Sequence, residues 1–413
     1  MSRLFKELRR VEDALSIVYR YIEPLPSERV STDEALGRVL AEDVISPMDI
    51  PPYDRVAFDG YAVRAEDTFG ASQDNPVVLK IRGTSFPGEE FEGEISAMEA
   101  VEVSTGAPLP KGADAVVPLE HSRRLGDHVE ILKQVAPGAN VDRAGSDLRA
   151  GDLVLRKGTQ VGPFELLALA SLNVTEVSVI RRPMVCLIAI GNELVELGSE
   201  LRRGSVVNSN VLGVRALIEE LADVRYLGIC RDDVYSLRDR LSSCSDCDII
   251  VTIAGSSVGE RDYLKDAIEL MGGSILVRGL SMMPGRPTSL AIVNGKILVG
   301  LPGYPVSAMI ATMEVLLPIL QKLSGIEGHP VRTSVRARLS KRVPSSPGVR
   351  HYVRVKLMRE GGEYRALPVR IGGAGIVSSL VRSDGFLIVP EEVEGYEEGE
   401  YVDVIVHRRW LDI

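Results

Sequence analysis

Three turns rich in glycine and proline border predicted strands and carry groups that could bind an anion. Gly255–Gly259 (GSSVG) ends one strand and is followed by Asp262, while Met283–Pro287 (MPGRP) and Leu301–Ala308 (LPGYPVSA) border two others. In an open α/β sheet, ligands bind outside the carboxyl ends of the strands, where loop N–H groups can hold phosphate. The sequence therefore predicts an anion-binding crevice at one edge of a parallel sheet.

Arg286 is the clearest candidate for contacting that anion. Pro284 and Pro287 flank it and stiffen its turn, and a rigid guanidinium suits a phosphate or another tetrahedral oxyanion. The GSSVG turn alone is a weak signal, because it is not GxGxxG and no Walker lysine follows it. No serine, histidine and acid stand in a recognisable nucleophilic arrangement. An oxyanion site is thus favoured over a Rossmann or P-loop site.

Carboxylates gather in the predicted loops around this crevice. Each one alone could be a turn capped by its own side chain, and Thr105-Gly106 could be a plain turn. Carboxylates near a phosphate-holding loop repel the ligand unless a hard cation lies between them, which points to Mg²⁺ with oxygen ligands. The carboxylates are Asp59, Asp147, Glu193, Asp232, Asp233 and Asp262. The last four of these leave or follow strands of the same predicted sheet.

The elements before residue 176 read as two helices, a β region and a third helix. Apolar residues at alternating spacings of four and three from Leu4 to Ile22 predict an amphipathic helix, and a second is expected from Ser31 or Thr32 to about Leu40. Residues 46–137 carry short β patterns punctuated by glycine, which predict a small β domain. Gly162-Pro163 then opens a helix from Phe164 to Leu172.

Residues 176–325 have the pattern of an α/β domain. Short, continuous apolar runs such as VCLIAI and DIIVTI are typical of strands buried on both faces. They alternate with helices expected at Val211–Leu221, Val234–Ser242 and Asp262–Leu270, which predicts a three-layer sandwich around a mostly parallel sheet. A long apolar helix, Pro305 to Leu323, closes the domain. Only strand and turn patterns follow residue 328, so we expect a terminal β domain.

The composition is that of a multidomain globular protein. The chain has 413 residues, of which 45% are hydrophobic and 26% charged, and we expect two to four domains. A net charge of −10 argues against nucleic acid or an anionic membrane as a partner. The charged N-terminus indicates no secretory signal, and no apolar run approaches the ~20 residues that cross a bilayer. The four cysteines are expected to be ordinary thiols of a cytoplasmic protein.

Taken in order along the chain, the motifs resemble the molybdopterin molybdenumtransferases, called MoeA in bacteria and represented in eukaryotes by the E domain of gephyrin. The resemblance covers nearly the whole chain, and so many motifs in one order are far more specific than any one of them. They are ALGRVLAEDV, DRVAFDGYAV, STGAPLPKGADAVV, GNELVE, VVNSN, RDD, SSVGERDY, MPGRP, GLPGYPVSA and GIVSSLVRSDG.

The resemblance implies a multidomain α/β plus β fold and a particular reaction. The expected domains are an N-terminal linker (1–46 and 148–178), an inserted β domain (47–147), a MogA-like molybdopterin-binding sandwich (179–326) and a C-terminal β barrel (331–410). Family members are homodimers whose cleft is shared between subunits. They insert molybdate into adenylylated molybdopterin, supplied by a MogA-type adenylyltransferase, and release AMP with the help of Mg²⁺.

Functional residues carry over position by position from the family pattern. The catalytic set implied is Asp59, Thr105, Asp147, Glu193 and Asp262, and the metal set is Glu193, Asp232 or Asp233, and Asp262. The substrate-binding set is Gly255, Ser257, Gly259, Pro284, Gly285, Arg286, Pro287, Pro302, Gly303, Ser307, Arg354, Ser378 and Ser379.

The chain departs from the family pattern around the phosphate and oxyanion positions. The usual TSGGVSVG is TIAGSSVG here, and Ala254 would restrict a backbone that needs positive φ. Met283 and Arg286 replace the lysines of KPGKP, and Tyr304 replaces the asparagine of GNPVSA. One interpretation is an altered oxyanion preference, such as tungstate. Another is a paralogue with reduced catalysis that binds pterin or acts as a scaffold. The adenylyltransferase step itself is disfavoured by the extra β domains.

Overall fold

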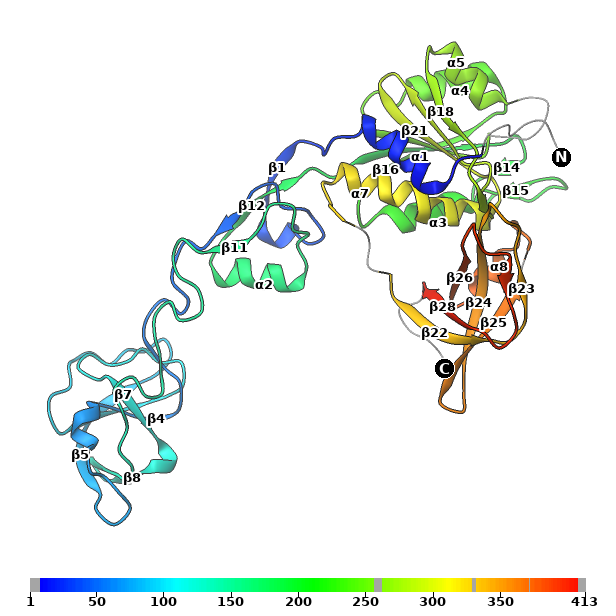
Figure 1. Ribbon diagram of the computed structural model, residues 1–413. Coiled ribbons are helices and arrows are strands. Elements are labelled where there is room, and N and C mark those ends of the chain that lie inside the picture. The colour runs from blue at the N-terminus through cyan, green and yellow to red at the C-terminus, as the bar shows by residue number, and fades with distance from the viewer. Residues whose placement is uncertain (1–7, 256–261, 329–331, 371, 408–413) are drawn as a thin grey trace. The chain divides into compact units, whose positions relative to one another are not determined.

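The computed structural model describes residues 8–255, 262–328, 332–370 and 372–407, which form two compact units (Figure 1). The larger unit comprises Met1–Ala41, Gly158–Gly162 and Val177–Ile413, and the smaller comprises Glu42–Lys157 and Pro163–Glu176.

The larger unit is built around a six-stranded, mostly parallel sheet. The four strands at one side are parallel, whereas β20 runs antiparallel to both of its neighbours. Buried apolar runs form these strands as expected, and all five residues of β17 are buried. In spatial order the strands are β16 (Asp223–Cys230), β13 (Met184–Ile190), β17 (Ile249–Ile253), β21 (Lys296–Leu301), β20 (Ser289–Val293) and β18 (Ser274–Arg278).

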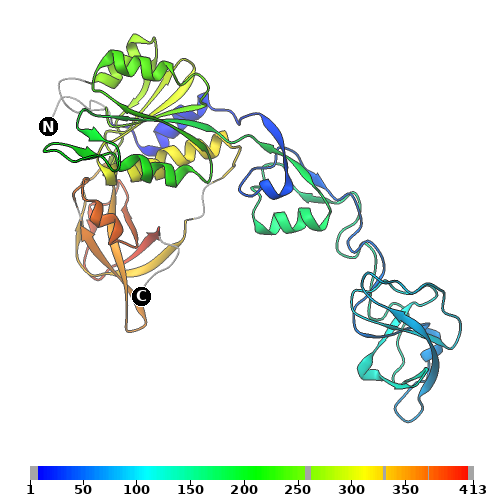
Figure 2. The same cartoon turned by 180° about the vertical axis from the view of Figure 1, so that it is seen from behind.

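Helices cover both faces of this sheet, which confirms the three-layer sandwich (Figure 2). One face packs against α1 (Val11–Val18), α3 (Asn210–Ile218) and the long helix, and the other against α4 (Val234–Ser242) and α5 (Tyr263–Leu270). The long helix comprises α6 (Pro305–Ala311), a π-helical turn η5 (Thr312–Leu316) and α7 (Leu317–Leu323). Pro318, which lacks an N–H, lies just after the π-helical turn, so a break in the regular hydrogen-bond ladder is expected there.

That long helix corrects the expectation that no apolar run approaches the length of a membrane span. Pro305–Leu323 has 19 residues and a mean hydropathy of 1.4, which pass a test of length and composition. Of its 18-residue apolar window, 67% is buried within the protein, as in the central helix of a folded domain.

Within the described residues, the two N-terminal helices are shorter than their sequence patterns indicate, and Leu4, where the first pattern starts, lies outside those residues. The first begins at Val11, because Arg9 pairs with Leu280 in an extended bridge, and a 3₁₀ turn η1 (Tyr19–Tyr21) follows it. The second is a single 3₁₀ turn, η2 (Thr32–Glu34). Residues beyond it pair instead in extended bridges, such as that of Leu40 with Val179. Nearby, β1 (Ser27–Ser31) pairs with β12 (Glu176–Ile180).

The C-terminal part of the larger unit is a closed five-stranded barrel, as expected. Strand β24 (Arg350–Glu360) pairs with both β25 (Glu363–Arg370) and β26 (Gly385–Val389), which closes the ring. β19 (Met282–Met283), from the α/β domain, adds to β24 in parallel. The remaining elements are β22 (Ser334–Leu339), β28 (Tyr401–Val406), the pair β23 (Val343–Pro344) and β27 (Gly395–Tyr396), and the short helix α8 (Val377–Val381).

The smaller unit contains the predicted β domain and the predicted helix α2 (Pro163–Ser171). Its main sheet has the order β7 (Ala115–Pro118), β4 (Gly60–Val63), β6 (Glu99–Val103), β5 (Val77–Ser85), β9 (His128–Ile131) and β8 (Ser122–Leu125). Two pairs lie outside this sheet, β2 (Val44–Ile45) with β11 (Leu153–Leu155) and β3 (Arg55–Val56) with β10 (Val141–Asp142). The 3₁₀ turns are η3 (Ala65–Thr68) and η4 (Leu119–His121).

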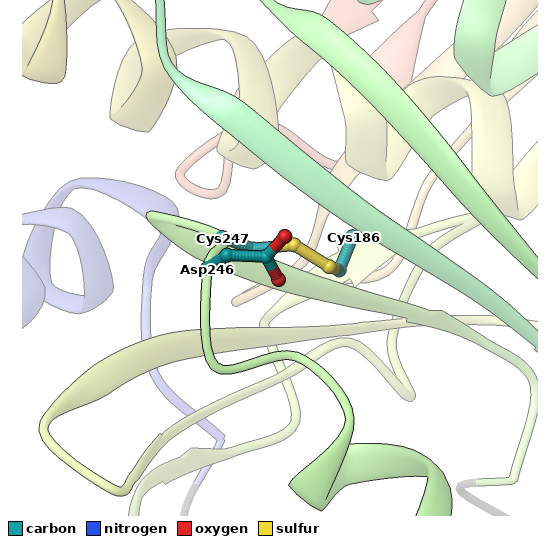
Figure 3. Close-up of side chains that lie close together, drawn as sticks. All are labelled: Cys186, Asp246 and Cys247. Carbon is teal, nitrogen blue, oxygen red and sulfur yellow. A yellow bond between two sulfur atoms is a disulfide. The ribbon is translucent and has the colours of Figure 1, made fainter.

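Two of the four cysteines form a disulfide, which corrects the expectation of ordinary thiols (Figure 3). Cys186 lies on β13, and Cys247 precedes the neighbouring parallel strand β17, so their Cα atoms are 5.7 Å apart. Cys230 and Cys244 are free and buried. The two bonded cysteines are 61 residues apart in the sequence, so the short Cys-x-x-Cys spacing could not predict that they pair.

Candidate functional site

A cavity of about 1060 Å³ lies in the larger unit, between the carboxyl edge of the α/β sheet and the barrel. Nine of the predicted site residues line it, and both domains contribute. They are Glu193, Pro284, Gly285, Arg286, Pro287, Pro302, Gly303, Ser307 and Arg354.

Arg354 of β24 is a buried cation at the wall of this cavity. Its side chain is 1% exposed, and burial, followed by the nearby charge of Arg370, lowers the pKa of its guanidinium. Its Nη2 donates to the carbonyl oxygen of Gly372 at 2.5 Å, while its Nε has no partner among the described residues. None of the described carboxylates pairs with it. A buried charge without a counter-ion is costly, so this position favours an anion.

Arg286 is presented by a turn closed by its own hydrogen bonds. The Leu280 N–H donates to the Arg286 carbonyl at 2.9 Å, and the Thr288 hydroxyl donates to the Gly285 carbonyl at 2.6 Å. Gly285 has φ +123°, a backbone conformation that other residues rarely adopt, so this position favours glycine. The turn holds the exposed Arg286 side chain at the cavity wall, as its two prolines predict.

The start of α6 forms a third wall, in which backbones approach closely. Asn210 Nδ2 donates to the Gly303 carbonyl at 2.8 Å, and a Cβ on Gly303 would lie 3.0 Å from that of Ala254. Ala254 itself has φ +68°, so the residue that replaces a family glycine is held in the left-handed region. Ser307 is buried, whereas the Tyr304 side chain is exposed.

One part of the wall was missed by the sequence analysis. The loop Gly372–Gly375 (GGAG) of the barrel lines the cavity, and its Ala374 carbonyl accepts from the Val306 N–H at 3.0 Å. Gly373 has φ +86°. The glycine content was the available signal, but the loop follows a barrel strand rather than the α/β strands on which the prediction concentrated. His351, Asn208 and Asn210 were also not singled out and line the cavity.

The acidic residues of the α/β domain follow strands β13, β16 and β17 but have different surroundings. Glu193 lines the cavity, and Asp232 Oδ2 accepts from the Asn192 N–H at 3.1 Å in the neighbouring loop. Asp233 caps α4 by accepting from the Ser236 N–H. Asp262 caps α5 and pairs with Arg278 at 2.9 Å. Asp232, Asp233 and Asp262 do not line the cavity.

These carboxylates do not form a ready-made metal cage within the described residues. The one group of three possible ligands with atoms within 4.8 Å of one another is Cys186, Asp246 and Cys247, two of which form the disulfide. Arg225 further occupies that cluster, since it pairs with Asp246 at 2.5 Å and lies 3.3 Å from the Cys186 sulfur.

In the smaller unit, Asp59 and Thr105 form one group. Asp59 Oδ1 accepts from the Thr105 N–H at 2.7 Å and from its hydroxyl at 2.8 Å, and these two bonds lower the pKa of Asp59. Gly60 follows in β4, where a Cβ would lie 2.0 Å from the Val117 carbonyl, so the strand next to Asp59 requires glycine. Asp147 is exposed, and its N–H donates to the Ile50 carbonyl at 3.0 Å.

Five of the remaining predicted residues lie away from the cavity wall or beyond the described part. Gly255 has φ +83° and does not line the cavity. Ser379 is buried, with its hydroxyl donating to the Ile376 carbonyl at 2.6 Å, and Ser378 stands beside it in α8. Ser257 and Gly259 lie outside the described residues.

The fold and the cavity define a class: a multidomain protein in which an α/β sandwich and a β barrel together line a cavity that holds two arginines. Family models give this class a more specific identity. They match a MoeA N-terminal region (domain I and II) at residues 9–173, a probable molybdopterin binding domain at 186–322 and a MoeA C-terminal region (domain IV) at 336–407.

Similar proteins cover the chain almost end to end. A putative molybdopterin biosynthesis protein of Methanocaldococcus jannaschii is 35% identical over 97% of this chain and 99% of its own. A molybdopterin molybdenumtransferase of Bacillus subtilis is 32% identical over 96% and 94%. The crystal structure of a molybdopterin biosynthesis MoeA protein from Pyrococcus horikoshii shares 36% identity, covers 98% of this chain and 100% of that chain, and has a TM-score of 0.82. The chain therefore belongs to the MoeA family.

Proposed function

We propose that this protein inserts molybdate, or tungstate, into adenylylated molybdopterin and releases AMP. The observation that carries the proposal is the pair of cations at one cavity, the buried Arg354 and the turn-mounted Arg286. A tetrahedral dianion would neutralise both. Membership of the MoeA family, together with relatives named molybdopterin molybdenumtransferase, supplies the substrate class.

The cavity also offers apolar surface beside the cations. Val206, Met283, Tyr304 and Val377 line it, and each is an exposed large hydrophobic residue. An apolar wall next to an oxyanion site suits an amphipathic ligand with a planar ring and phosphate groups. In the proposed reaction, water cleaves the phosphoanhydride to give AMP and the pterin monophosphate. The two dithiol sulfurs bond to the metal as their protons pass to one oxygen of the oxyanion, which leaves as water. Arg286 and Arg354 would hold the oxyanion and disperse its charge.

The donor set fits Mg²⁺ that is carried mainly by the substrate phosphates. Mg²⁺ is usually bound by one or two carboxylates together with phosphate oxygens and water, so no protein cage is required. Glu193 is the acid at the cavity wall. Asp232 accepts a hydrogen bond from the N–H of Asn192, the residue that precedes Glu193. We propose these two as ligands. Asp233 and Asp262 hold helix N-termini, so binding a metal would cost those bonds. When bound, Mg²⁺ would neutralise charge on the phosphates.

Asp59, Thr105 and Asp147 are proposed as further catalytic residues from the smaller unit. The two bonds from Thr105 lower the pKa of Asp59 and so favour its ionised form, which is the form that orients a cation or accepts a proton. We also propose a cytoplasmic homodimer that receives its substrate from a MogA-type adenylyltransferase. Light scattering on the purified chain would test the dimer.

The direct test combines the purified chain with adenylylated molybdopterin, Mg²⁺ and either oxyanion, and measures AMP release. We expect release that depends on the oxyanion and on Mg²⁺. Absence of release with both oxyanions, under conditions where the Bacillus subtilis relative is active, would contradict the proposal.

A second candidate is a pterin-binding or scaffolding protein with reduced catalysis. It is favoured by Ala254, which stands in the left-handed region at the cavity wall, and by Tyr304 at the start of α6. Binding of the adenylylated pterin without AMP release would support it. Restored release in Ala254→Gly would show that this backbone position limits turnover.

A further inference from the structure

Three segments far apart in the sequence meet at a cluster that we call the charged junction, formed by Glu12, Arg350 and Glu391. Arg350 Nη1 donates to Glu12 of α1 at 2.5 Å. Its Nε and Nη2 donate to Glu391 of the barrel at 3.3 and 3.2 Å. One guanidinium therefore joins the N-terminal helix to the barrel.

The junction adjoins the point where the barrel meets the Arg286 turn. The Arg350 N–H donates to the Ser281 carbonyl at 2.8 Å, and Met282 and Met283 pair in parallel with Arg350 and His351. On the other side, the Ser281 N–H donates to the Arg9 carbonyl at 2.8 Å. The strand leading into the Arg286 turn is thus held between the N-terminal segment and the first residue of β24.

Arg350 does not itself line the cavity, but its strand continues directly into the cavity wall. Arg354 lies on β24 four residues later, and Arg286 lies three residues beyond β19. Both cations therefore project from segments that are joined beside Arg350. The Arg350–Glu391 pair of the junction is largely shielded, because the Glu391 side chain is 3% exposed and that of Arg350 is 21% exposed, whereas Glu12 is exposed. A shielded pair of this kind holds its geometry, because loss of one partner leaves a buried charge.

We propose that Arg350 is a positioning residue whose forked ion pairs fix the spacing between Arg286 and Arg354. This inference rests on the proposed function, since it assigns the spacing to recognition of the oxyanion. Two cations that must contact one small dianion tolerate little displacement, and misplacement by about 1 Å can cost up to roughly 100-fold in rate. Lysine could not reproduce the fork, because it offers a single point charge.

The test measures molybdate binding by calorimetry and AMP release by the full chain and three variants. Arg350→Gln should raise both the Kd and the KM for molybdate by on the order of tenfold, with a smaller change in kcat. Glu12→Gln, which alters the more exposed side of the junction, should give a smaller increase, and Arg350→Lys should fall between wild type and Arg350→Gln. Arg342→Gln is the matched control, because Arg342 pairs with Glu397 at 2.9 Å on the barrel surface. It should change neither constant.

The outcomes separate the inference from the function on which it rests. An unchanged molybdate Kd in folded Arg350→Gln overturns the inference, even when the wild type binds molybdate and releases AMP. If Arg350→Gln does not fold, Glu12→Gln decides in the same way. A wild-type chain that neither binds molybdate nor releases AMP removes the proposed function, and the inference falls with it.

Discussion

Replacing Arg354 by methionine is expected to stabilise the free protein while weakening its affinity for the oxyanion. The side chain is 1% exposed, its Nε lacks a partner in the described part of the chain, and one carbonyl accepts from its Nη2. Exchange of buried ionic groups for well-packed apolar side chains is often neutral or stabilising by about 1–4 kcal/mol. Methionine fills a similar volume without the charge, so we expect a gain within that range.

The affinity of the Arg354→Met variant for molybdate should fall. A hydrogen bond to a charged group contributes about 1.5–3 kcal/mol, which corresponds to a roughly 10- to 150-fold increase in Kd when it is lost. Molybdate at 100 times the wild-type Kd should stabilise the wild type by about 2.7 kcal/mol, and at the same concentration this increment should fall to about 0.3–1.4 kcal/mol in the variant.

Thermal unfolding with and without molybdate measures both effects in one experiment. Arg338→Met is the matched control, because Arg338 is an exposed arginine of the same barrel whose Nε donates to the Gly399 carbonyl at 3.0 Å. It should alter neither the free protein nor the molybdate increment. An Arg354→Met variant that is less stable than wild type, or that keeps the full increment, would refute the argument from an uncompensated buried charge.

Three further predictions follow from individual contacts. Replacing both Cys186 and Cys247 by serine should lower the free energy of unfolding of the α/β domain by about 4 kcal/mol, because the disulfide closes a loop with a sequence separation of 61 residues. Chemical denaturation measures this loss, and reductant should destabilise the wild type by the same amount as the double substitution. Thr105→Val removes one of the two hydrogen bonds that lower the pKa of Asp59, so that pKa should rise. The acidic limb of the pH–activity profile, where Asp59 gains its proton, should therefore move to higher pH. A limb that does not move would exclude Asp59 as the titrating group. Arg286→Ala should raise the molybdate Kd by roughly 10- to 150-fold in calorimetry, and an unchanged value would reassign Arg286 to the pterin phosphates or to structure.

The sheet and its helices were predictable because local sequence determines them. Runs such as Ile249–Ile253 are apolar throughout, since both faces of the strand are covered, and that pattern needs no knowledge of the neighbours. The N-terminal helix was overestimated for the opposite reason. Arg9 and Leu280 pair across 271 positions of sequence, and this contact holds the chain extended where periodicity favours a helix.

The position of a site residue was predictable where a single turn is stiffened by its own prolines. It was less predictable for a carboxylate that can bind either a helix N-terminus or a ligand. Arg286 stands at the cavity as Pro284 and Pro287 indicate. The loop acids could not be separated by sequence, because an aspartate that caps a helix and one that faces a ligand look alike. Asp262 shows this best: its cap of α5 is local, but its bond to Arg278 depends on β18, which follows later in the chain. The loop Gly372–Gly375 escaped because its place depends on barrel closure.

Strand β24 is hydrogen-bonded along its whole length, to β19 at its start, β26 through its first half and β25 to its end. Amide protons in such a strand exchange with solvent only when the surrounding barrel opens. Arg354 is therefore anchored to one of the slowest-exchanging elements of the larger unit, and deuterium should enter β24 well after it enters the loop at Gly372–Gly375. The ligand would therefore contact one segment, β24, whose amides exchange slowly, and another, the loop Gly372–Gly375, whose amides exchange sooner.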